Sequence, residues 1–275
     1  EAAVKAALDA GLYVIINIHW EGGWLNHPVD ANKEALDERL EAMWKQIALR
    51  FRDYDDRLLF AGTNEVNNDD ANGAQPTEEN YRVQNGFNQV FVNTVRATGG
   101  RNHYRHLIVQ AYNTDVAKAV AHFTMPLDIV QNRIFLECHY YDPYDFTIMP
   151  NDENFKSQWG AAFAGGDVSA TGQEGDIEAT LSSLNVFINN NVPVIIGEYG
   201  PTLRDQLTGE ALENHLKSRN DYIEYVVKTC VKNKLVPLYW DAGYTEKLFD
   251  RTTGQPHNAA SIAAIMKGLN LILTI

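Results

Sequence analysis

Residues 194–199, Val-Ile-Ile-Gly-Glu-Tyr, show the pattern that decides the fold. A short run of β-branched apolar residues, typical of a strand buried on both faces, leads directly into a carboxylate and an aromatic side chain. The same pattern recurs along the chain. It predicts six strands, over residues 13–18, 58–61, 106–110, 134–137, 194–196 and 235–239.

Amphipathic helices are predicted between these strands, because apolar residues recur three and four positions apart. One such stripe predicts a single helix over residues 177–188, and Thr77 is the predicted N-cap of a helix that ends near Gly99. The two longest stripes are Leu36, Leu40, Met43, Trp44, Ile47 and Phe51, and Leu212, Leu216, Ile223, Val226 and Cys230. Strands that alternate with helices in this way are parallel strands with crossover helices, so the fold class is α/β.

Two parallel α/β architectures fit this order, an open doubly wound sheet and a (β/α)8 TIM barrel. No glycine-rich phosphate loop follows any strand, which disfavours the nucleotide-binding open sheet. Polar and aromatic residues follow the strands instead, and in a barrel these strand ends meet at the rim where active sites are built. The sequence therefore favours the barrel, in an incomplete form with about six β/α units.

Composition excludes several classes of function. The chain has 275 residues, 45% of them hydrophobic, and a formal charge of −13 that repels nucleic acid. No apolar run approaches the roughly 20 residues that a membrane-spanning helix needs. Cys138 and Cys230 are too few for a disulfide framework or a structural zinc site, and we expect both thiols to be buried.

Two strand-end carboxylates, Glu65 and Glu198, carry the functional prediction. A glycosidase needs one carboxylic acid to protonate the leaving oxygen and a second carboxylate to attack the anomeric carbon or to activate water. Trp20, Trp24 and Trp240 lie near strand ends, where indole rings can stack on the apolar faces of sugars. Apart from His19 and His139, the histidines of the chain, His215 among them, are expected on the surface or in loops.

These motifs resemble glycoside hydrolase family 5 (cellulase family A), in its endo-β-1,4-glucanase and xyloglucanase-like branch. The resemblance covers nearly the whole chain and implies one catalytic domain over residues 1–275, in which strands three to eight of the barrel are visible. It implies a retaining endo-β-1,4-glycanase that hydrolyses β-glucan, cellulose or xyloglucan by double displacement, without a cofactor. It also implies a secreted or periplasmic location.

The resemblance assigns the two catalytic carboxylates residue by residue. Asn64-Glu65 matches the family's Asn-Glu pair after strand four, which makes Glu65 the general acid/base and Asn64 a ligand of the sugar 2-hydroxyl. Glu198, in Gly-Glu-Tyr-Gly, matches the nucleophile after strand seven. Val66 stands where the family usually has proline.

The remaining assignments concern substrate binding. His139 and Tyr141 match the His-x-Tyr pair after strand six, in which the tyrosine orients the nucleophile. His19 matches a substrate-contacting histidine after strand three, and Trp240 matches the platform beneath the sugar. The stretch from Trp20 to Trp24 is similar to the cellulase and xyloglucanase branch.

The sequence also suggests three alternatives to this assignment. Strands one and two are absent, and with them the family's arginine beside the nucleophile, so a catalytically impaired glycan-binding barrel is the second candidate. A metal-dependent hydrolase would need converging His and Asp ligands, and no H-x-H pair is present, so no metal is expected. Residues 68–73 with Glu79 fit a calcium-loop template except at Asn68, but Pro76 and the missing preceding helix favour an ordinary polar loop.

The predicted barrel also has open edges. Unpaired strand edges invite pairing, and residues 271–275, Leu-Ile-Leu-Thr-Ile, form a further uncharged strand-like run. We therefore expect a second copy of the chain, or an N-terminal fragment, as the protein partner that completes the barrel. The family resemblance implies a β-linked polysaccharide as the substrate.

Overall fold

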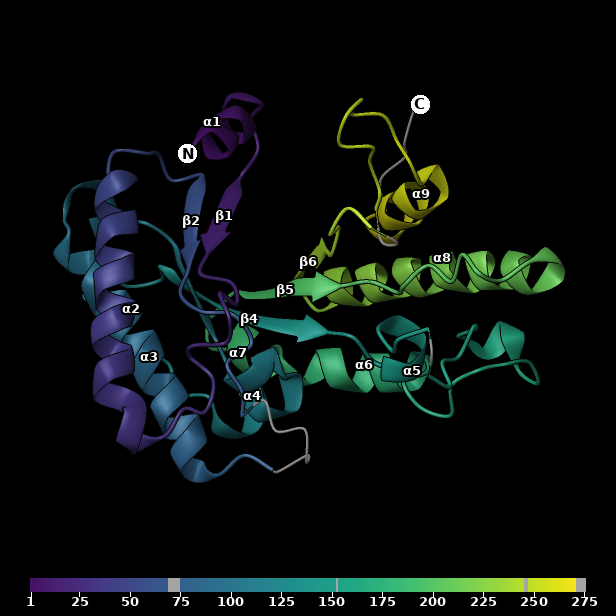
Figure 1. Ribbon diagram of the computed structural model, residues 1–275, viewed down its shortest axis with the longest axis horizontal. Coiled ribbons are helices and arrows are strands. Elements are labelled where there is room, and N and C mark those ends of the chain that lie inside the picture. Colours follow the sequence, from purple (N-terminus) through teal and green to yellow (C-terminus); the bar gives the residue numbers. More distant parts are fainter. Residues whose placement is uncertain (69–74, 152, 245–246, 271–275) are drawn as a thin grey trace. The chain divides into compact units, whose positions relative to one another are not determined.

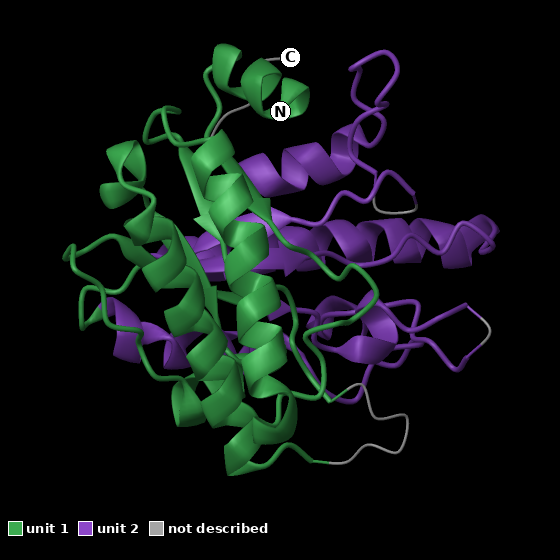
Figure 2. Ribbon diagram, turned by 60° about the vertical axis from the view of Figure 1, so that its left-hand side comes forward, with its two compact units in different colours: residues 1–138, 189–193 green, residues 139–188, 194–275 purple. Residues whose placement is uncertain are grey.

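The computed structural model describes residues 1–68, 75–151, 153–244 and 247–270. It divides into two compact units, residues 1–138 with 189–193 (unit 1) and residues 139–188 with 194–275 (unit 2), which are coloured separately in Figure 2. The loop that resembles a calcium site, at residues 69–73, and the strand-like run at residues 271–275 lie outside the described residues.

Unit 1 begins with helix α1 and alternates strands with helices, as predicted (Figure 1). Its elements are α1 (Ala2–Asp9), β1 (Val14–Asn17), α2 (Asp30–Arg50), β2 (Leu58–Ala61), α3 (Glu78–Ala97), η1 (Gly100–His103), β3 (Leu107–Gln110), η2 (Tyr112–Thr114), α4 (Val116–His122) and β4 (Ile134–Tyr140), whose last two residues belong to unit 2. The strands are parallel and pair in chain order, with Val14 opposite Leu58, Phe60 opposite Leu107 and Gln110 opposite Glu137.

The core of unit 1 lies where α2 and α3 pack side by side (Figure 1). Trp44 of α2 is fully buried, as its place on the apolar stripe predicts, and its ring lies 4.6 Å from that of Phe91. Its indole N–H donates to the carbonyl of Gly62, just after β2 (2.8 Å). A Cβ at Gly62 would lie only 2.6 Å from the Phe91 ring, so glycine lets this segment pass close to the helix.

Helix α3 begins as its sequence predicts. The Thr77 hydroxyl accepts the N–H of Asn80, and the Asn80 side chain accepts the N–H of Thr77, which completes a capping box. Glu79 lies in the first turn of α3, where its carboxylate accepts the N–H of Asp30 (2.9 Å).

Unit 2 contains the second group of elements. They are α5 (Tyr144–Thr147), η3 (Ala161–Phe163), α6 (Glu174–Ser183), α7 (Asn185–Ile188), β5 (Val194–Tyr199), α8 (Gly209–Lys232), β6 (Val236–Tyr239) and α9 (Ala259–Gly268). Strands β5 and β6 are parallel, and α9 packs along α8 (Figure 1). The single helix predicted over residues 177–188 is wrong, because the chain turns at Leu184 between α6 and α7.

The predicted face of α8 is wrong in its first half. Leu216 is exposed, whereas His215, Ser218 and Arg219 are buried. Loop groups explain this reversal, since Ser157 accepts a hydrogen bond from His215 and Pro201 accepts one from Arg219. Buried polar side chains with such partners replace the apolar stripe.

Both cysteines are buried in the described structure, as predicted. Burial raises the pKa of the Cys230 thiol to about 12 and raises that of Cys138 further. Thiols with such raised pKa values are unreactive at neutral pH, because the thiolate is the nucleophile.

Candidate active site

Glu65 lies in a tight turn that follows β2 in unit 1. Its backbone φ is +47°, in the left-handed region that non-glycine residues seldom adopt. Two side chains hold this turn: the Glu65 N–H donates to Gln110 Oε1 (3.2 Å), and the Glu65 carbonyl accepts from Asn67 Nδ2 (2.9 Å). Both polar groups of the strained peptide therefore have side-chain partners, and the Glu65 carboxylate starts from a fixed backbone.

The predicted sugar contacts of unit 1 differ in exposure. Asn64 is buried beside Glu65, whereas His19 is exposed, with Nδ1 at 3.3 Å from Asn17 Nδ2. Trp20 is 57% exposed and offers an open indole surface. Trp24 is half-buried against the core, and the Arg39 guanidinium lies 4.3 Å from the centre of its ring. Trp20 is therefore the more open of the two indoles, and the sugar-binding role of each stays a prediction.

Glycine is required beside Trp20. Gly23 has a φ of +68°, and a Cβ at this position would lie 3.1 Å from the indole nitrogen of Trp20. Both the backbone conformation and the close approach favour glycine. Gly23 therefore shapes the loop that presents Trp20.

Glu198 lies near the end of β5 in unit 2 and is buried. The Tyr141 hydroxyl donates to Glu198 Oε2 at 2.9 Å, which confirms the predicted contact. His139 Nδ1 lies 3.6 Å from the same oxygen. A donor on one carboxylate oxygen fixes the direction in which the carboxylate points. This arrangement suits a nucleophile that attacks with a defined lone pair.

The turn after β4 holds Tyr141 in place. The Thr147 hydroxyl hydrogen-bonds the carbonyls of Tyr141 and Pro143, the second at 3.0 Å. The Tyr222 hydroxyl donates to the carbonyl of Asp142 (2.9 Å). Because these backbone carbonyls are hydrogen-bonded to side chains of α5 and α8, the backbone that carries the Tyr141 phenol is held in place.

Trp240 follows β6 in unit 2 and is half-buried. Its backbone N–H donates to the Tyr199 carbonyl at 2.9 Å, and Tyr199 packs edge-on against Tyr239, with 5.6 Å between ring centres. Arg219 of α8 donates to the Tyr239 hydroxyl (2.6 Å). Trp240 therefore starts from a backbone that is tied to β5, and its role as a sugar platform stays a prediction.

Each unit thus brings together one part of the predicted site. Unit 1 holds His19, Trp20, Trp24, Asn64 and Glu65, and unit 2 holds His139, Tyr141, Glu198 and Trp240. The separation of about 5–5.5 Å between the Glu65 and Glu198 carboxyls, which a retaining mechanism requires, stays a prediction.

Three polar residues of these environments were not predicted as site residues. Gln110 and Glu137 are buried at the ends of apolar runs, and a polar residue at such a strand position is a signal that could have identified them. Arg219 gave no such signal, because its partners Pro201 and Ser261 are remote in sequence.

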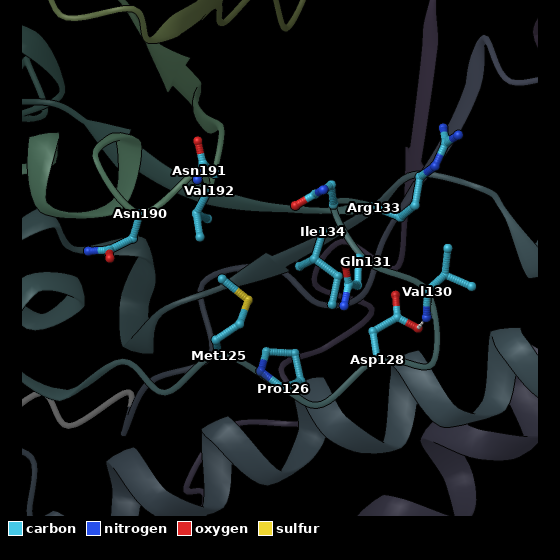
Figure 3. Close-up of a pocket in the computed structure, with 11 residues that line it drawn as sticks. Met125, Pro126, Asp128, Val130, Gln131, Arg133, Ile134, Asn190, Asn191 and Val192 are labelled. Carbon is cyan, nitrogen blue, oxygen red and sulfur yellow. Dashed lines mark hydrogen bonds between the residues drawn. The ribbon is translucent and has the colours of Figure 1, made fainter.

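A separate pocket lies in unit 1 (Figure 3). It has a volume of about 260 Å³, and its lining comes from the segments before β4 and β5, at Met125, Pro126, Asp128, Val130, Gln131, Asn132, Arg133, Ile134, Asn190, Asn191 and Val192. None of the predicted site residues lines it, and its Asp128 is paired with Arg96 (2.6 Å).

Parallel β/α units with glutamates near their strand ends are an arrangement that α/β glycoside hydrolases use. The chain belongs to glycosyl hydrolase family 5, because the family's cellulase model matches residues 1–246. Solved structures of this family are (β/α)8 barrels, and the described residues of this chain contain parallel strands of that fold in both units, β1 to β4 and β5 to β6.

Similar proteins are endoglucanases and xyloglucanases. Endoglucanase A of Paenibacillus barcinonensis is 34% identical over an alignment of 292 residues, gaps included, which covers 98% of this chain and 70% of that protein. Endoglucanase B of Clostridium cellulovorans is 34% identical over 261 residues, covering 92% of this chain and 54% of its relative. The structure of a family 5 xyloglucanase from Paenibacillus pabuli, in complex with ligand, matches with a TM-score of 0.89 and 35% identity, over 98% of this chain and 78% of that one.

Proposed function

We propose that this chain is a retaining endo-β-1,4-glycanase that hydrolyses β-glucan, cellulose or xyloglucan-type polysaccharides by double displacement. The hydrogen bond from Tyr141 to Glu198 carries this proposal, because it prepares one strand-end carboxylate for attack (2.9 Å). Relatives that are endoglucanases and a xyloglucanase support the choice of substrate class.

The proposed reaction has two steps. In the first, a Glu198 oxygen attacks the anomeric carbon, and the glycosidic C–O bond breaks as the Glu65 carboxyl gives its proton to the leaving oxygen. In the second, the Glu65 carboxylate removes a proton from water, the water oxygen attacks the anomeric carbon, and the bond to Glu198 breaks. Tyr141 keeps its hydrogen bond to Glu198 when the carboxylate is free, and so favours the leaving form of the nucleophile.

The substrate contacts follow the predicted assignments. Asn64 and His139 hydrogen-bond the sugar at the reacting ring, His19 and the open indole of Trp20 contact the chain nearby, and Trp240 stacks on a pyranose face. Trp24 contributes a partly covered ring. We further propose that residues 1–275 act as one catalytic domain, and that the protein is secreted or periplasmic. Among the described residues, no helix is long and apolar enough to cross a bilayer.

We also propose that a second copy of the chain, or a separate N-terminal fragment, pairs with the edge of the sheet. Among the described strands, β1 pairs with β2 alone, so its outer backbone groups are available to another strand. Light scattering in dilute solution tests this proposal. We expect a stable dimer of the isolated chain, whereas an active 31 kDa monomer would overturn the homodimer.

Reducing-end release from β-glucan, xyloglucan, glucomannan and xylan tests the activity. We expect release from the first two, an initial product that keeps the β configuration by proton NMR, and no turnover by Glu198→Ala. Glu65→Ala should slow aryl β-cellobiosides with poor leaving groups more than the 2,4-dinitrophenyl substrate. Sugar binding by the folded wild type without release of reducing ends would favour the glycan-binding barrel instead.

A further inference from the structure

We propose that Gln110, oriented by Glu137, is a positioning residue for the general acid/base Glu65. The inference rests on the proposed function of Glu65 and adds two residues to the machinery of that step. Its starting point is the turn at Glu65, whose left-handed backbone (φ +47°) keeps its N–H on the Gln110 side-chain oxygen (3.2 Å). Unusual backbone geometry of this kind persists only where the surroundings over-determine it.

The side-chain amide of Gln110 has one accepting end and one donating end, and its orientation matters. The N–H of Glu65 can only donate, so it needs Oε1 of Gln110. Turning the amide over would place two donors against each other. The Thr63 hydroxyl, 3.4 Å from the same Oε1, lies on this side as well.

Glu137 selects the orientation that Glu65 needs. Gln110 Nε2 lies 3.0 Å from Glu137 Oε2, and an ionised carboxylate can only accept hydrogen bonds. The carboxylate therefore keeps the donor end of the amide on its side and the acceptor end toward Glu65. In this scheme Glu137 acts on Glu65 through Gln110.

The frame around Gln110 is rigid. Gln110 and Glu137 are register partners on the parallel strands β3 and β4, and both side chains are buried. Two amides of α3 hold the Gln110 backbone: its carbonyl accepts from Asn88 Nδ2 (2.8 Å) and from Gln84 Nε2 (3.2 Å). These buried hydrogen bonds hold the backbone of Gln110 in place, although Gln84 Oε1 itself has no partner among the described residues.

Position matters because proton transfer to the leaving oxygen depends on distance. A misplacement of about 1 Å in a catalytic group can reduce a rate by about 100-fold. Loss of the Gln110 contact frees the Glu65 turn to relax toward an ordinary backbone conformation, which moves the carboxyl. The loss should be largest when the leaving group most needs a proton.

The test compares two aryl β-cellobiosides, phenyl and 2,4-dinitrophenyl, in matched variants of the full chain. For Gln110→Leu and Glu137→Leu we expect kcat/KM to fall about 10- to 100-fold on the phenyl substrate, and much less on the dinitrophenyl one. Glu137→Gln offers an amide oxygen to Gln110 and should keep most of the rate that Glu137→Leu loses. A merely structural role would lower kcat/KM equally on the two substrates.

Exchanging the side chains of Gln110 and Glu137 gives the most decisive comparison. Gln110→Glu alone places two carboxyl groups against each other and should lose activity on the phenyl substrate. In the double variant Gln110→Glu/Glu137→Gln, the new carboxylate accepts the Glu65 N–H and the new amide donates to it, so activity should be regained. Should a single variant fail to fold, this double variant decides the proposal.

Amide hydrogen exchange gives a readout that does not depend on turnover. Peptides that contain residues 63–67 should exchange faster in Gln110→Leu and Glu137→Leu, and at the wild-type rate in the double variant. Asn102→Ala serves as the control: its side chain is buried in η1, before β3, where its amide donates to the Ala48 carbonyl (2.7 Å). This control variant should lower the melting temperature without changing the ratio of kcat/KM between the two substrates.

The outcomes separate this inference from the proposed function. Absence of leaving-group dependence in Glu65→Ala would overturn the acid/base role of Glu65, and this inference with it. Suppose that Glu65→Ala slows the phenyl substrate more than the dinitrophenyl one, whereas Gln110→Leu slows both equally and leaves amide exchange in residues 63–67 unchanged. That result would overturn the positioning role alone. A double variant that stays as slow as Gln110→Glu would also overturn it.

Discussion

The Tyr141 hydroxyl donates a hydrogen bond of 2.9 Å to Glu198 Oε2, and both residues belong to the same compact unit. Removing this donor should weaken the nucleophile. A hydrogen bond to a charged group contributes about 1.5–3 kcal/mol, so we expect Tyr141→Phe to lower kcat/KM about 10- to 150-fold. Steady-state kinetics on an aryl cellobioside measures this loss.

The neighbouring tyrosine provides a matched control for this substitution. The Tyr140 hydroxyl is buried, and it has no hydrogen-bond partner among the described residues. Tyr140→Phe removes the same atom without breaking a hydrogen bond, so stability should stay the same or rise. Equal losses of activity in Tyr140→Phe and Tyr141→Phe would contradict the orienting role of Tyr141.

Trp240 should act on binding more than on folding, because it is only half-buried. Loss of its ring from a sugar contact should cost about 1–3 kcal/mol, the scale for burying one large side chain, which raises Kd about 5- to 150-fold. Calorimetric titration of cellotetraose into Glu198→Ala, with and without Trp240→Ala, measures the change.

A buried tryptophan of the same unit separates binding from stability. Trp159 is 2% exposed, and its indole N–H donates to the Gly172 carbonyl (2.6 Å). Trp159→Phe should lower the melting temperature and leave cellotetraose affinity unchanged. If Trp240→Ala behaves in the same way, Trp240 is a core residue and its assignment as a platform is wrong.

The sequence predicts the strands well because each contains a continuous apolar run, although β1 and β6 are only partly buried. Residues 58–61 are predicted without error, whereas β4 and β5 extend beyond the predicted apolar runs, to Tyr140 and Tyr199. Contacts between distant segments were missed. His215 was expected at the surface, yet it is buried, since Ser157 and Arg204 supply partners from loops that periodicity cannot bring together.

Buried Arg219 should stabilise unit 2 by joining three segments. Its guanidinium donates to the Pro201 carbonyl (2.8 Å), the Ser261 hydroxyl (2.7 Å) and the Tyr239 hydroxyl (2.6 Å). Arg219→Met leaves these acceptors without their donor, and each loss costs about 1–3 kcal/mol, so the free energy of unfolding should fall by at least about 2 kcal/mol. Urea denaturation measures it.

The control for Arg219 lies two residues earlier on the same helix. Lys217 is exposed, and its ammonium lies 5.5 Å from the ring centre of Phe163. Lys217→Met removes a charge from the surface and should change stability by no more than about 0.5 kcal/mol. Similar losses in the two variants would show that the charge, rather than the buried hydrogen bonds, matters.

His215 should make unit 2 sensitive to acid. Burial lowers its pKa below the ordinary value of 6.5, and the charges of Arg219 and Arg204 lower that pKa further. The imidazole Nε2 accepts the Arg204 N–H (3.0 Å), while Nδ1 bonds the Ser157 carbonyl (2.8 Å), so the folded protein holds the neutral ring. Protonation would place a second donor against the Arg204 N–H.

The sign of the effect follows from proton binding. Because the folded pKa lies below the unfolded value, the unfolded chain binds the extra proton below about pH 6.5. The contribution of His215 to stability is therefore present above that pH and is lost as the pH falls. In His215→Gln, which cannot titrate, the melting temperature should fall less between pH 7.5 and pH 5.0 than in the wild type. Thermal unfolding followed by circular dichroism at both pH values measures the two drops, and equal drops would mean that His215 does not drive the loss.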